Sequence, residues 1–310
     1  MDISRLDNNP NLLIKKNINA SKLSYFGSGG KLCTVIFPRS AVQLIWTIDQ
    51  LKGQKYYIIG RGSNTLISDR GSEDAVIHTG RLSKITVDRT SIYAEAGAGI
   101  KAVSIAARNA GLNGMEKLSG IPGTIGGAVY MNAGAYGSDM GSLVEYADVL
   151  IGDRIERIAA KDLGFSYRRS SLIDNGGVVL GVSLSLIKSN YNDIIKEEER
   201  YRTLRLNSQP RERSLGSVFK AYNGIPAAKY IEELKVKGLR IGGAEISRVH
   251  CNFIINRENA TTGDYIALAR LVQDKVRERY GILLQTELTY IGEADEDFRR
   301  LSYAYDLQPR

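Results

Sequence analysis

The sequence predicts an α+β protein of three successive units, and three patterns point to it. Up to about Asp69, apolar runs typical of strands alternate with a helical stretch. From Ala75 to about Ile187 strand signals dominate, and the composition changes again near Asn207. A chain of 310 residues with 43% hydrophobic and 25% charged residues is long enough for two or three packed domains. We therefore expect a first unit at 1–70, a second at 71–206, a third at 207–293 and an extension at 294–310.

In the first unit, apolar runs predict strands at 34–37 and 56–59 with a helix at 41–51 between them. The second unit has strand signals at 92–94, 144–151 and 177–186, and the last of these alternates apolar with small residues. A helix at 100–110 interrupts these strands and ends at Gly111. The first unit is therefore a small α/β unit, and the second is rich in strands.

The third unit follows a charged helix at 192–206, which Gln209-Pro210 ends. Beyond it we expect a helix at 227–234, a strand at 252–256 and a long helix at 264–280. Gly281 provides the stop of that helix, and a strand at 283–291 closes the unit. The tail from Ala294 to Arg310 is polar, so we expect a loosely held extension.

Composition excludes several classes of protein. No apolar run approaches the roughly 20 residues of a membrane span, and the polar start lacks a signal peptide, so the expected location is the cytoplasm. The net charge of +8 is spread along the chain, which favours small anionic ligands over nucleic acid. With only His78 and His250, a metal site of several histidines is impossible, and Cys33 and Cys251 are expected to be reduced. A metal-free mechanism follows, in which other side chains or an organic cofactor carry the chemistry.

Two glycine-rich segments are the best candidates for a ligand site. Six glycines fall between Gly120 and Gly137, where exposed backbone N–H groups can approach an anionic ligand. The other loop, which is the first of the two along the chain, is Gly60-Arg61-Gly62-Ser63-Asn64-Thr65 and directly follows the strand at 56–59. Ligands of α/β folds usually bind at that end of a strand. Tight turns between short strands are the alternative interpretation, but two such loops favour a ligand with two polar portions, such as a dinucleotide.

Neither loop matches a common nucleotide-binding motif. Gly30-Lys31 is followed by Leu32 rather than Ser or Thr, so it is no Walker loop. Neither glycine-rich loop has the Gly-x-Gly-x-x-Gly spacing between a strand and a helix. An ordinary Rossmann or P-loop protein is therefore not expected.

Three further segments concentrate reactive side chains. Arg168 and Arg169 are suited to a carboxylate, although a solvated surface pair is the simpler interpretation. Ser217 follows a glycine beside cationic residues and could instead cap a turn. Glu287 lies in the expected closing strand, where an exposed alternating position is the simpler alternative.

Taken together, these segments resemble one family in order and over residues 24–293. The matching segments are Ser119-Gly-Ile-Pro-Gly-Thr-Ile-Gly-Gly-Ala128, Gly62-Ser63-Asn64, Tyr167-Arg168, Gly216-Ser-Val-Phe-Lys220, Gly242-Gly-Ala244, His250-Cys-Asn-Phe-Ile-Ile-Asn256 and Glu287. The chain thus resembles the UDP-N-acetylenolpyruvoylglucosamine reductase (MurB) family, in its shorter type II form. Each segment alone is a weak signal, whereas the ordered set is specific.

The resemblance implies a two-subdomain FAD-binding fold of the PCMH/vanillyl-alcohol-oxidase type followed by an α/β substrate-binding domain. It implies noncovalent FAD, NADPH as the hydride donor, no metal, and reduction of the enolpyruvyl ether of UDP-N-acetylglucosamine to UDP-N-acetylmuramate in peptidoglycan synthesis. A cytoplasmic monomer that binds neither nucleic acid nor membranes is expected.

The family pattern also assigns roles to residues of this sequence. The implied catalytic residues are Arg168, Ser217 as the proton donor, and Glu287. The implied substrate-binding residues are Tyr167, Arg168, Lys220 and Asn252. The implied cofactor-binding residues are Gly60, Arg61, Gly62, Ser63, Asn64, Thr65, Ser119, Gly120, Pro122, Gly123, Thr124, Gly126 and Gly127.

Some features depart from the family or leave alternatives open. Ala221-Tyr222 replaces the Asn-Pro that commonly follows the serine segment, which puts one polar substrate contact in doubt. An FAD-dependent oxidase of the same fold group is the alternative enzyme, and such proteins often tether flavin through histidine. A basic nucleotide- or nucleic-acid-binding module is the non-enzymatic alternative.

Overall fold

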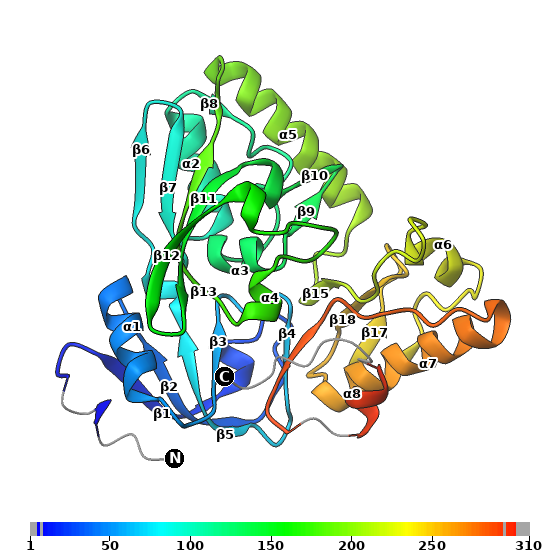
Figure 1. The fold of residues 1–310 in the computed structure, drawn as a ribbon. Coiled ribbons are helices and arrows are strands. Elements are labelled where there is room, and N and C mark those ends of the chain that lie inside the picture. The colour runs from blue at the N-terminus through cyan, green and yellow to red at the C-terminus, as the bar shows by residue number, and fades with distance from the viewer. Residues whose placement is uncertain (1–4, 7–8, 294–295, 302–310) are drawn as a thin grey trace.

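The computed structural model describes residues 5–6, 9–293 and 296–301. Figure 1 shows an upper lobe made of the second unit, a lower lobe made of the first unit, and the third unit to their right. Antiparallel sheets form the second and third units, and a mostly parallel sheet forms the first. The chain is therefore α+β, as the sequence predicted.

The first unit is a four-stranded sheet covered by one helix. Its strand order is β1 (Leu13–Asn19), β2 (Lys31–Phe37), β5 (Ser72–His78) and β3 (Tyr56–Ile59). Strands β2, β5 and β3 are parallel, whereas β1 runs antiparallel to β2. Helix α1 (Ala41–Gln50) begins after Ser40, whose hydroxyl accepts a hydrogen bond from the Gln43 N–H. The expected boundary at residue 70 falls inside this sheet, because β5 lies between β2 and β3, so we propose that the unit extends to His78.

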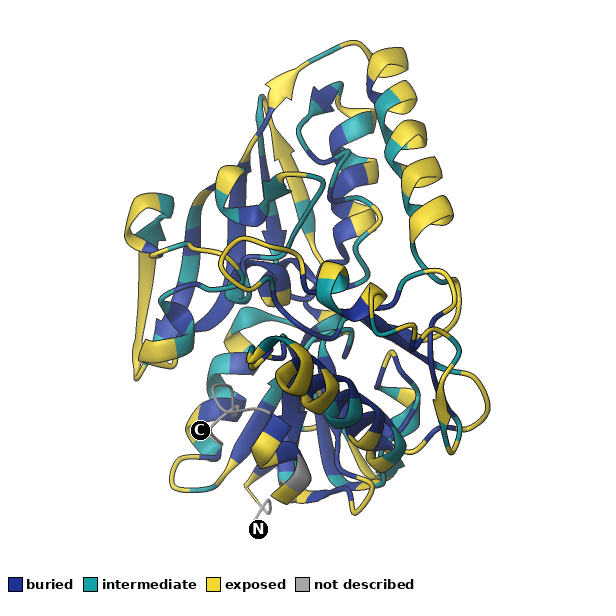
Figure 2. Cartoon of the chain, turned by 90° about the vertical axis from the view of Figure 1, so that its right-hand side faces the viewer, coloured by how far each residue is buried: buried dark blue, intermediate teal, exposed yellow. Residues whose placement is uncertain are grey.

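The second unit contains a five-stranded antiparallel sheet. Its order is β12 (Arg154–Ala159), β11 (Val144–Ile151), β13 (Val178–Ser185), β7 (Ser91–Glu95) and β6 (Ile85–Asp88). Seven of the eight residues of β13 are buried, because helix α3 (Ile125–Tyr130) contacts one face of this central strand and the core of the first unit packs on the other. Figure 2 shows the contrast with the long helix at the top, α5 (Tyr191–Ser208), which is largely exposed. The remaining elements are α2 (Ile100–Asn109), α4 (Leu172–Asn175), β8 (Leu112–Asn113), β9 (Gly134–Ala135), β10 (Ser138–Asp139) and β14 (Ile187–Lys188).

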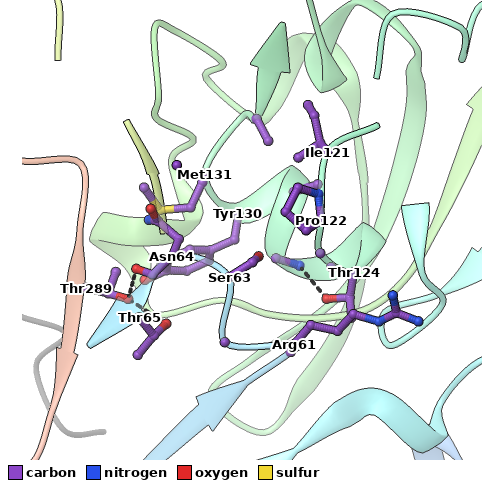
Figure 3. Close-up of a pocket in the computed structure, with 18 of the residues that line it drawn as sticks. Arg61, Ser63, Asn64, Thr65, Ile121, Pro122, Thr124, Tyr130, Met131 and Thr289 are labelled. Atoms are coloured by element: carbon purple, nitrogen blue, oxygen red, sulfur yellow. Dashed lines mark hydrogen bonds between the residues drawn. The ribbon is translucent and has the colours of Figure 1, made fainter. Parts of the chain in front are cut away.

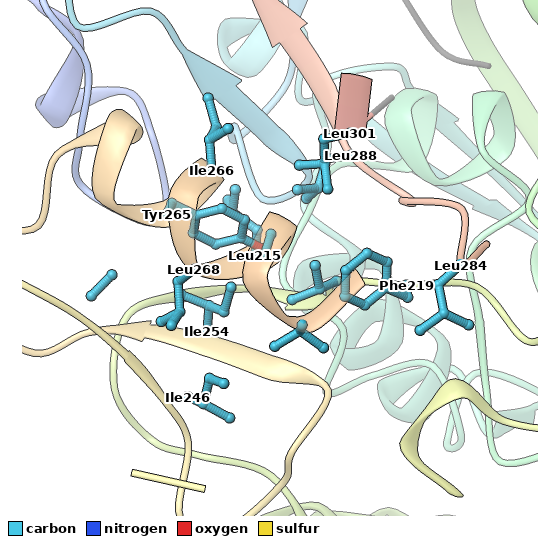
Figure 4. Packing of buried hydrophobic residues seen from close by; sticks show 14 of the residues in the cluster. Leu215, Phe219, Ile246, Ile254, Tyr265, Ile266, Leu268, Leu284, Leu288 and Leu301 are labelled. Atoms are coloured by element: carbon cyan, nitrogen blue, oxygen red, sulfur yellow. The ribbon is translucent and has the colours of Figure 1, made fainter. Parts of the chain in front are cut away.

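The third unit packs two helices against a small antiparallel sheet. The sheet order is β15 (Ser214–Ser217), β18 (Phe253–Asn256), β17 (Ala244–Ile246) and β16 (Arg240–Ile241), and the helices are α6 (Ala227–Glu232) and α7 (Thr262–Tyr280). A capping box between Thr261 and Asp264 begins α7, and Gly281 ends it with a φ of 68°. Figure 4 shows Tyr265, Leu268 and Ile254 within the apolar core that joins α7 to the sheet.

The chain then returns to the first unit through a short parallel strand pair. Strand β19 (Thr289–Ile291) pairs with β4 (Thr65–Ile67), which directly follows the first glycine loop. The closing strand was expected at 283–291, so this prediction is wrong for 283–288. Those residues find their backbone partners in loops, as when the Glu287 N–H donates to the Val218 carbonyl. The pairing places Glu287 beside the first glycine loop.

The expectation of a loosely held tail is wrong for residues 296–301. Helix α8 (Glu296–Leu301) packs against α7, and Phe298 and Leu301 are buried. The ring of Phe298 stacks on Tyr290 of β19 at a centroid distance of 4.2 Å. The rest of the tail, 294–295 and 302–310, lies outside the described residues.

Most other expected elements are confirmed within a few residues. The strands expected at 56–59 and 144–151 have the predicted bounds, and the helices expected at 41–51, 100–110, 192–206 and 264–280 are α1, α2, α5 and α7. Among the described helices, none has the length and apolar character needed to cross a membrane.

Candidate active site

A cavity of about 430 Å³ lies where the three units meet, and both glycine loops line it. The loops touch one another. A Cβ built on Gly60 would lie 2.4 Å from Thr124 Oγ1, and one on Gly123 would lie 3.3 Å from Ser63 Oγ. The structure thus brings two segments far apart in sequence into the wall of one cavity.

The first loop is fixed by backbone contacts that only a residue without a Cβ allows. Gly62 has a φ of 61°, and a Cβ there would lie 2.4 Å from the Leu23 carbonyl oxygen. The side chain of Asn64 donates to the Glu287 carbonyl at 2.8 Å, and the hydroxyls of Thr65 and Thr289 are 2.9 Å apart. Figure 3 shows these side chains together on one side of the pocket. The loop is therefore tied directly to the segment that carries Glu287.

The second loop, at residues 121–127, leads into α3, and two of its glycines leave room for different neighbours. Thr124 precedes the helix, and its hydroxyl accepts from the Gly127 N–H. A Cβ on Gly126 would lie 2.8 Å from that of Ala96, so this glycine lets α3 pack closely on the end of β7. A Cβ on Gly127 would meet only Thr124 Oγ1, at 3.4 Å, and Gly127 is exposed on the cavity wall. Gly127 thus leaves room for a ligand, whereas Gly126 leaves room for the protein itself.

Two of the expected cofactor residues lie away from the cavity. The Ser119 hydroxyl donates to the Glu116 carbonyl at 2.9 Å, and Ser119 is not part of the cavity wall. Gly120 is exposed and is also outside the wall, and the side chain of Arg205 lies against it. The expected ligand contacts at Ser119 and Gly120 therefore gain no support from the cavity, whose wall in this loop begins at Ile121, and they stay predictions.

Substitution of Gly127 by valine is expected to lower occupancy of the FAD that the family resemblance implies without unfolding the protein, because the new side chain would enter the space left on the cavity wall. Gly126→Val is the matched comparison, in which the new side chain presses on Ala96 and destabilises the fold. The ratio of flavin absorbance to protein absorbance, measured with the thermal unfolding midpoint, separates the two effects. Wild-type flavin content in Gly127→Val would contradict the placement of the ligand.

An ion pair in the cavity wall joins the second unit to the third. Arg168 Nε lies 3.0 Å from Glu287 Oε2, and Arg168 Nη2 donates to the Gly134 carbonyl at 3.1 Å. The Arg168 side chain is only 23% exposed, so the simpler interpretation as a solvated surface pair is wrong for this residue. Arg169 instead pairs with Asp174 near the surface. Arg168 is therefore held in the cavity wall by contacts on both of its sides.

Glu287 is a nearly buried carboxyl, with 12% of its side chain exposed. Burial raises the pKa of Glu287, while Arg168 and Lys220 act in the opposite direction. The alternative of an exposed strand position is therefore wrong. A carboxyl of this kind can be protonated at a higher pH than usual and can then approach an anionic ligand.

Ser217 ends β15 and lies in the cavity wall together with Arg168 and Glu287. Lys220 follows three residues later and is buried, and the backbone N–H of Lys220 donates to the Gln285 carbonyl at 2.8 Å. The segment from Val218 to Lys220 therefore runs beside the segment that carries Glu287. This pairing brings the Ser217 hydroxyl and the Glu287 carboxyl into one cavity wall, whereas Lys220, whose charge acts on Glu287, lies outside that wall.

The two remaining substrate candidates lie outside the cavity wall. The Tyr167 hydroxyl accepts from the Ala221 N–H at 3.3 Å, and the residue is 56% exposed. The Asn252 amide accepts from the Phe219 N–H at 3.0 Å and donates to the Phe219 carbonyl at 2.9 Å. Because Asn252 is buried and lies outside the cavity wall, we propose that it positions the serine segment instead of contacting the substrate.

Sequence reasoning missed several residues of the cavity wall. They include Tyr130, Met131, Tyr136, Arg205, Gln209, Phe253 and Thr289. Tyr136 stands in the glycine-rich stretch and could have been noticed for that reason. Arg205 gives no signal in sequence, since it is one of many charged residues of α5.

The composition of the wall fits a dinucleotide such as FAD. One part offers backbone N–H groups and hydroxyls of the two glycine loops, which suit phosphates. Another part is apolar and aromatic, with Pro122, Tyr130, Met131 and Val179. Within the described residues, no three His, Cys, Asp or Glu side chains gather in a way that could hold a metal ion.

Fold and site together define a protein of the FAD-binding class that carries a second, ligand-covering domain. Residues 34–153 match the FAD binding domain family, and residues 209–291 match the C-terminal domain of UDP-N-acetylenolpyruvoylglucosamine reductase. The fold predicted from the sequence is thereby confirmed. The chain belongs to the UDP-N-acetylenolpyruvoylglucosamine reductase family.

Curated relatives and a solved structure support this assignment. The reductase of Limosilactobacillus reuteri is 36% identical over 290 residues, which span 92% of this chain and 97% of the relative. The Streptococcus pneumoniae reductase is 40% identical over 276 residues, 87% of this chain and 91% of the relative. The crystal structure of UDP-N-acetylenolpyruvylglucosamine reductase (MurB) from Thermus caldophilus aligns with a TM-score of 0.79 at 31% identity, covering 90% and 99% of the two chains.

Proposed function

We propose that this protein reduces the enolpyruvyl ether of UDP-N-acetylglucosamine to UDP-N-acetylmuramate, a step of peptidoglycan synthesis, with noncovalent FAD and with NADPH as the hydride donor. The observation that carries this proposal is the convergence of Arg168, Glu287 and Ser217 on the cavity that both glycine loops line. Membership of the reductase family supports it.

The residues of the two loops that line the cavity would hold FAD. Its phosphates suit the backbone of residues 60–65 and 122–127, and its ring system suits the apolar wall around Tyr130 and Met131. When bound, FAD supplies the hydride that it takes from NADPH and passes to the enolpyruvyl double bond. The third unit would cover the UDP-sugar.

Arg168 would bind the carboxylate of the enolpyruvyl group, since its guanidinium is fixed in the cavity wall and always charged. Addition of hydride to the β-carbon leaves negative charge on the α-carbon and the adjacent carboxylate. Arg168 stabilises this charge as it forms, and Glu287, when protonated, adds a hydrogen bond instead of a repulsive charge. The pair therefore acts on the transition state.

Ser217 would then donate its hydroxyl proton to the α-carbon. A serine hydroxyl is a weak acid, but a carbanion is basic enough to take its proton. The nearby Lys220 would stabilise the alkoxide that remains until water or another donor restores the proton.

The oxidase alternative gains no support from the site. His78 Nδ1 accepts from the Gly80 N–H, His250 Nδ1 accepts from the Asn252 N–H, and neither ring lines the cavity. A histidine tether for flavin would need one of them there.

We also propose that the protein is cytoplasmic and acts as a monomer. Light scattering of the purified protein would test the monomeric state.

The affinity for the enolpyruvyl substrate is expected to fall as the pH rises through the raised pKa of Glu287. The reason is that the ionised carboxyl competes for Arg168 and repels the substrate carboxylate. KM measured against pH checks this, and Glu287→Gln should flatten that limb of the profile.

The pH dependence of the unfolding free energy provides a second measurement of the same pKa. Because the folded-state pKa is raised, the stabilisation from the protonated carboxyl is present at low pH and is lost as the pH rises through that value. Glu287→Gln should remove this dependence too. Glu212→Gln, at a surface carboxylate paired with Arg257, should leave both profiles unchanged, and a KM limb that persists in Glu287→Gln would contradict the assignment.

A further inference from the structure

Arg205 is a cation in the cavity wall that has no role in the proposed mechanism. It lies in the last turn of α5, its side chain lies against Gly120, and its Nη1 donates to Gln209 Oε1 at 2.6 Å. Burial lowers the pKa of Arg205, and the only group opposing this shift within the described chain is Tyr136, not a carboxylate. A half-buried guanidinium that faces a cavity without an acidic partner is suited to an anionic ligand.

Tyr136 presents a second unused group beside Arg205. Its hydroxyl is buried and has no hydrogen-bond partner in the part of the chain that the structure describes. Tyr136 adopts a φ of 55° in the turn between β9 and β10, a conformation uncommon for residues other than glycine. Its ring packs on Tyr201 at a centroid distance of 5.2 Å, and the guanidinium carbon of Arg205 lies 5.8 Å from the ring centre. Figure 1 shows the hairpin of β9 and β10 beside the end of α5.

The charge of this cluster indicates the kind of ligand group that it can hold. One guanidinium, one phenol hydroxyl and the amide of Gln209 offer several donors but a single positive charge. A diphosphate carries two negative charges, twice the positive charge that this cluster offers. The cluster therefore suits a planar group that carries one negative charge spread over neighbouring nitrogen and oxygen atoms.

A flavin ring gains such a charge on reduction. Hydride from NADPH brings two electrons and one proton to the neutral ring, NADP⁺ leaves, and the ring keeps one negative charge on N1 and the C2 carbonyl oxygen. The cluster lies close to the reactive end of the cavity, because Gly134, two residues before Tyr136, accepts a hydrogen bond from Arg168. The ring must reach that end to act on the substrate.

We propose that Arg205 and Tyr136 form an anion subsite that holds the pyrimidine edge of the bound flavin and stabilises its reduced form. This inference rests on the proposed function, since it needs a bound FAD. Arg205 would raise the flavin midpoint potential and so favour transfer of hydride from NADPH to the protein. Tyr136 would add a hydrogen bond to the same edge, and its packing on Tyr201 would keep the hydroxyl in place.

The test is the midpoint potential of the flavin, measured against a reference dye in wild-type protein and in variants. Arg205→Met is expected to weaken binding of reduced relative to oxidised flavin at least tenfold, a decrease of about 30 mV for a two-electron couple. Arg205→Lys should keep most of the potential, and Tyr136→Phe, which keeps the ring packing, should shift it by less in the same direction. Arg202→Met is the control, because Arg202 belongs to the same helix but pairs with Glu199 at the surface.

The outcomes separate this inference from the proposed function. An unchanged potential in both Arg205→Met and Tyr136→Phe would overturn the inference, and a higher KM for the UDP-sugar in those variants would assign the subsite to the substrate diphosphate instead. If Arg205→Met holds no flavin, Tyr136→Phe and Arg205→Lys decide the question. Wild-type protein that binds no FAD would instead contradict the proposed function itself.

Discussion

Replacement of Ser217 by alanine is expected to leave flavin reduction by NADPH at the wild-type rate and to slow flavin reoxidation by the enolpyruvyl UDP-sugar by about 10²- to 10⁴-fold. Only the second half-reaction needs a proton at the α-carbon of the substrate. Ser217 lies in the wall of the cavity, and its segment runs beside that of Glu287. Stopped-flow absorbance of the flavin measures each half-reaction separately.

A matched control lies in the same strand. Ser214 is buried in β15 but is not part of the cavity wall, so Ser214→Ala should leave both half-reactions unchanged. Loss of both half-reactions to the same extent in Ser217→Ala would contradict a role as proton donor. It would instead indicate that the serine supports the cofactor site.

Replacement of Arg168 by methionine is expected to lower kcat/KM for the UDP-sugar by about 10²- to 10³-fold, the loss typical of one charge-stabilising donor. Two effects act together. The substrate carboxylate loses its cation, and Glu287 loses the partner that lies 3.0 Å away in a nearly buried setting. Arg168→Lys should recover only part of the activity, because an ammonium cannot reach Glu287 and the Gly134 carbonyl in the same fork geometry.

Arg169 supplies the control for this substitution. It is adjacent in sequence and carries the same charge, but it pairs with Asp174 near the surface. Arg169→Met should therefore keep wild-type kinetics. Equal losses in the two variants would mean that the net charge of the segment matters and not the position of Arg168.

Much of the fold could be predicted because local patterns and tertiary packing agree there. The run at 56–59 is apolar and becomes a largely buried edge strand of the first sheet. The long helix α7 has a capping box at one end and glycine at the other, so its bounds follow from side-chain chemistry that acts within a few residues. The order of motifs then led to the family, and the comparisons confirm it.

Other parts depend on partners that local sequence does not reveal. Residues 283–288 look like a strand, but their neighbours are the loop at 218–220 and the Asn64 side chain, so no regular ladder forms. Helix α8 buries only Phe298 and Leu301 among its described side chains, too few for a periodic signal. The Asn64 contact with the Glu287 segment spans more than two hundred residues and could not be inferred from spacing.

The residues of the candidate site can likewise be divided into those that the sequence predicts and those that depend on packing. Arg168, Ser217 and Glu287 could be placed because each belongs to a motif, and the structure brings all three to one cavity. Ser119, Gly120 and Asn252 belong to the same motifs but lie outside the cavity wall, where Ser119 and Asn252 form hydrogen bonds with neighbouring backbone. A motif shows which segments matter, whereas the direction in which each side chain points is decided by packing.

The most direct measurement of the central claim is a single anaerobic titration of the purified protein, followed by flavin absorbance. We predict a noncovalent flavin spectrum that NADPH bleaches and that the enolpyruvyl ether of UDP-N-acetylglucosamine restores, with one UDP-N-acetylmuramate formed per flavin reoxidised. Flavin that remains with the protein after acid precipitation, or reduced flavin that oxygen reoxidises while the enolpyruvyl substrate does not, would contradict the account.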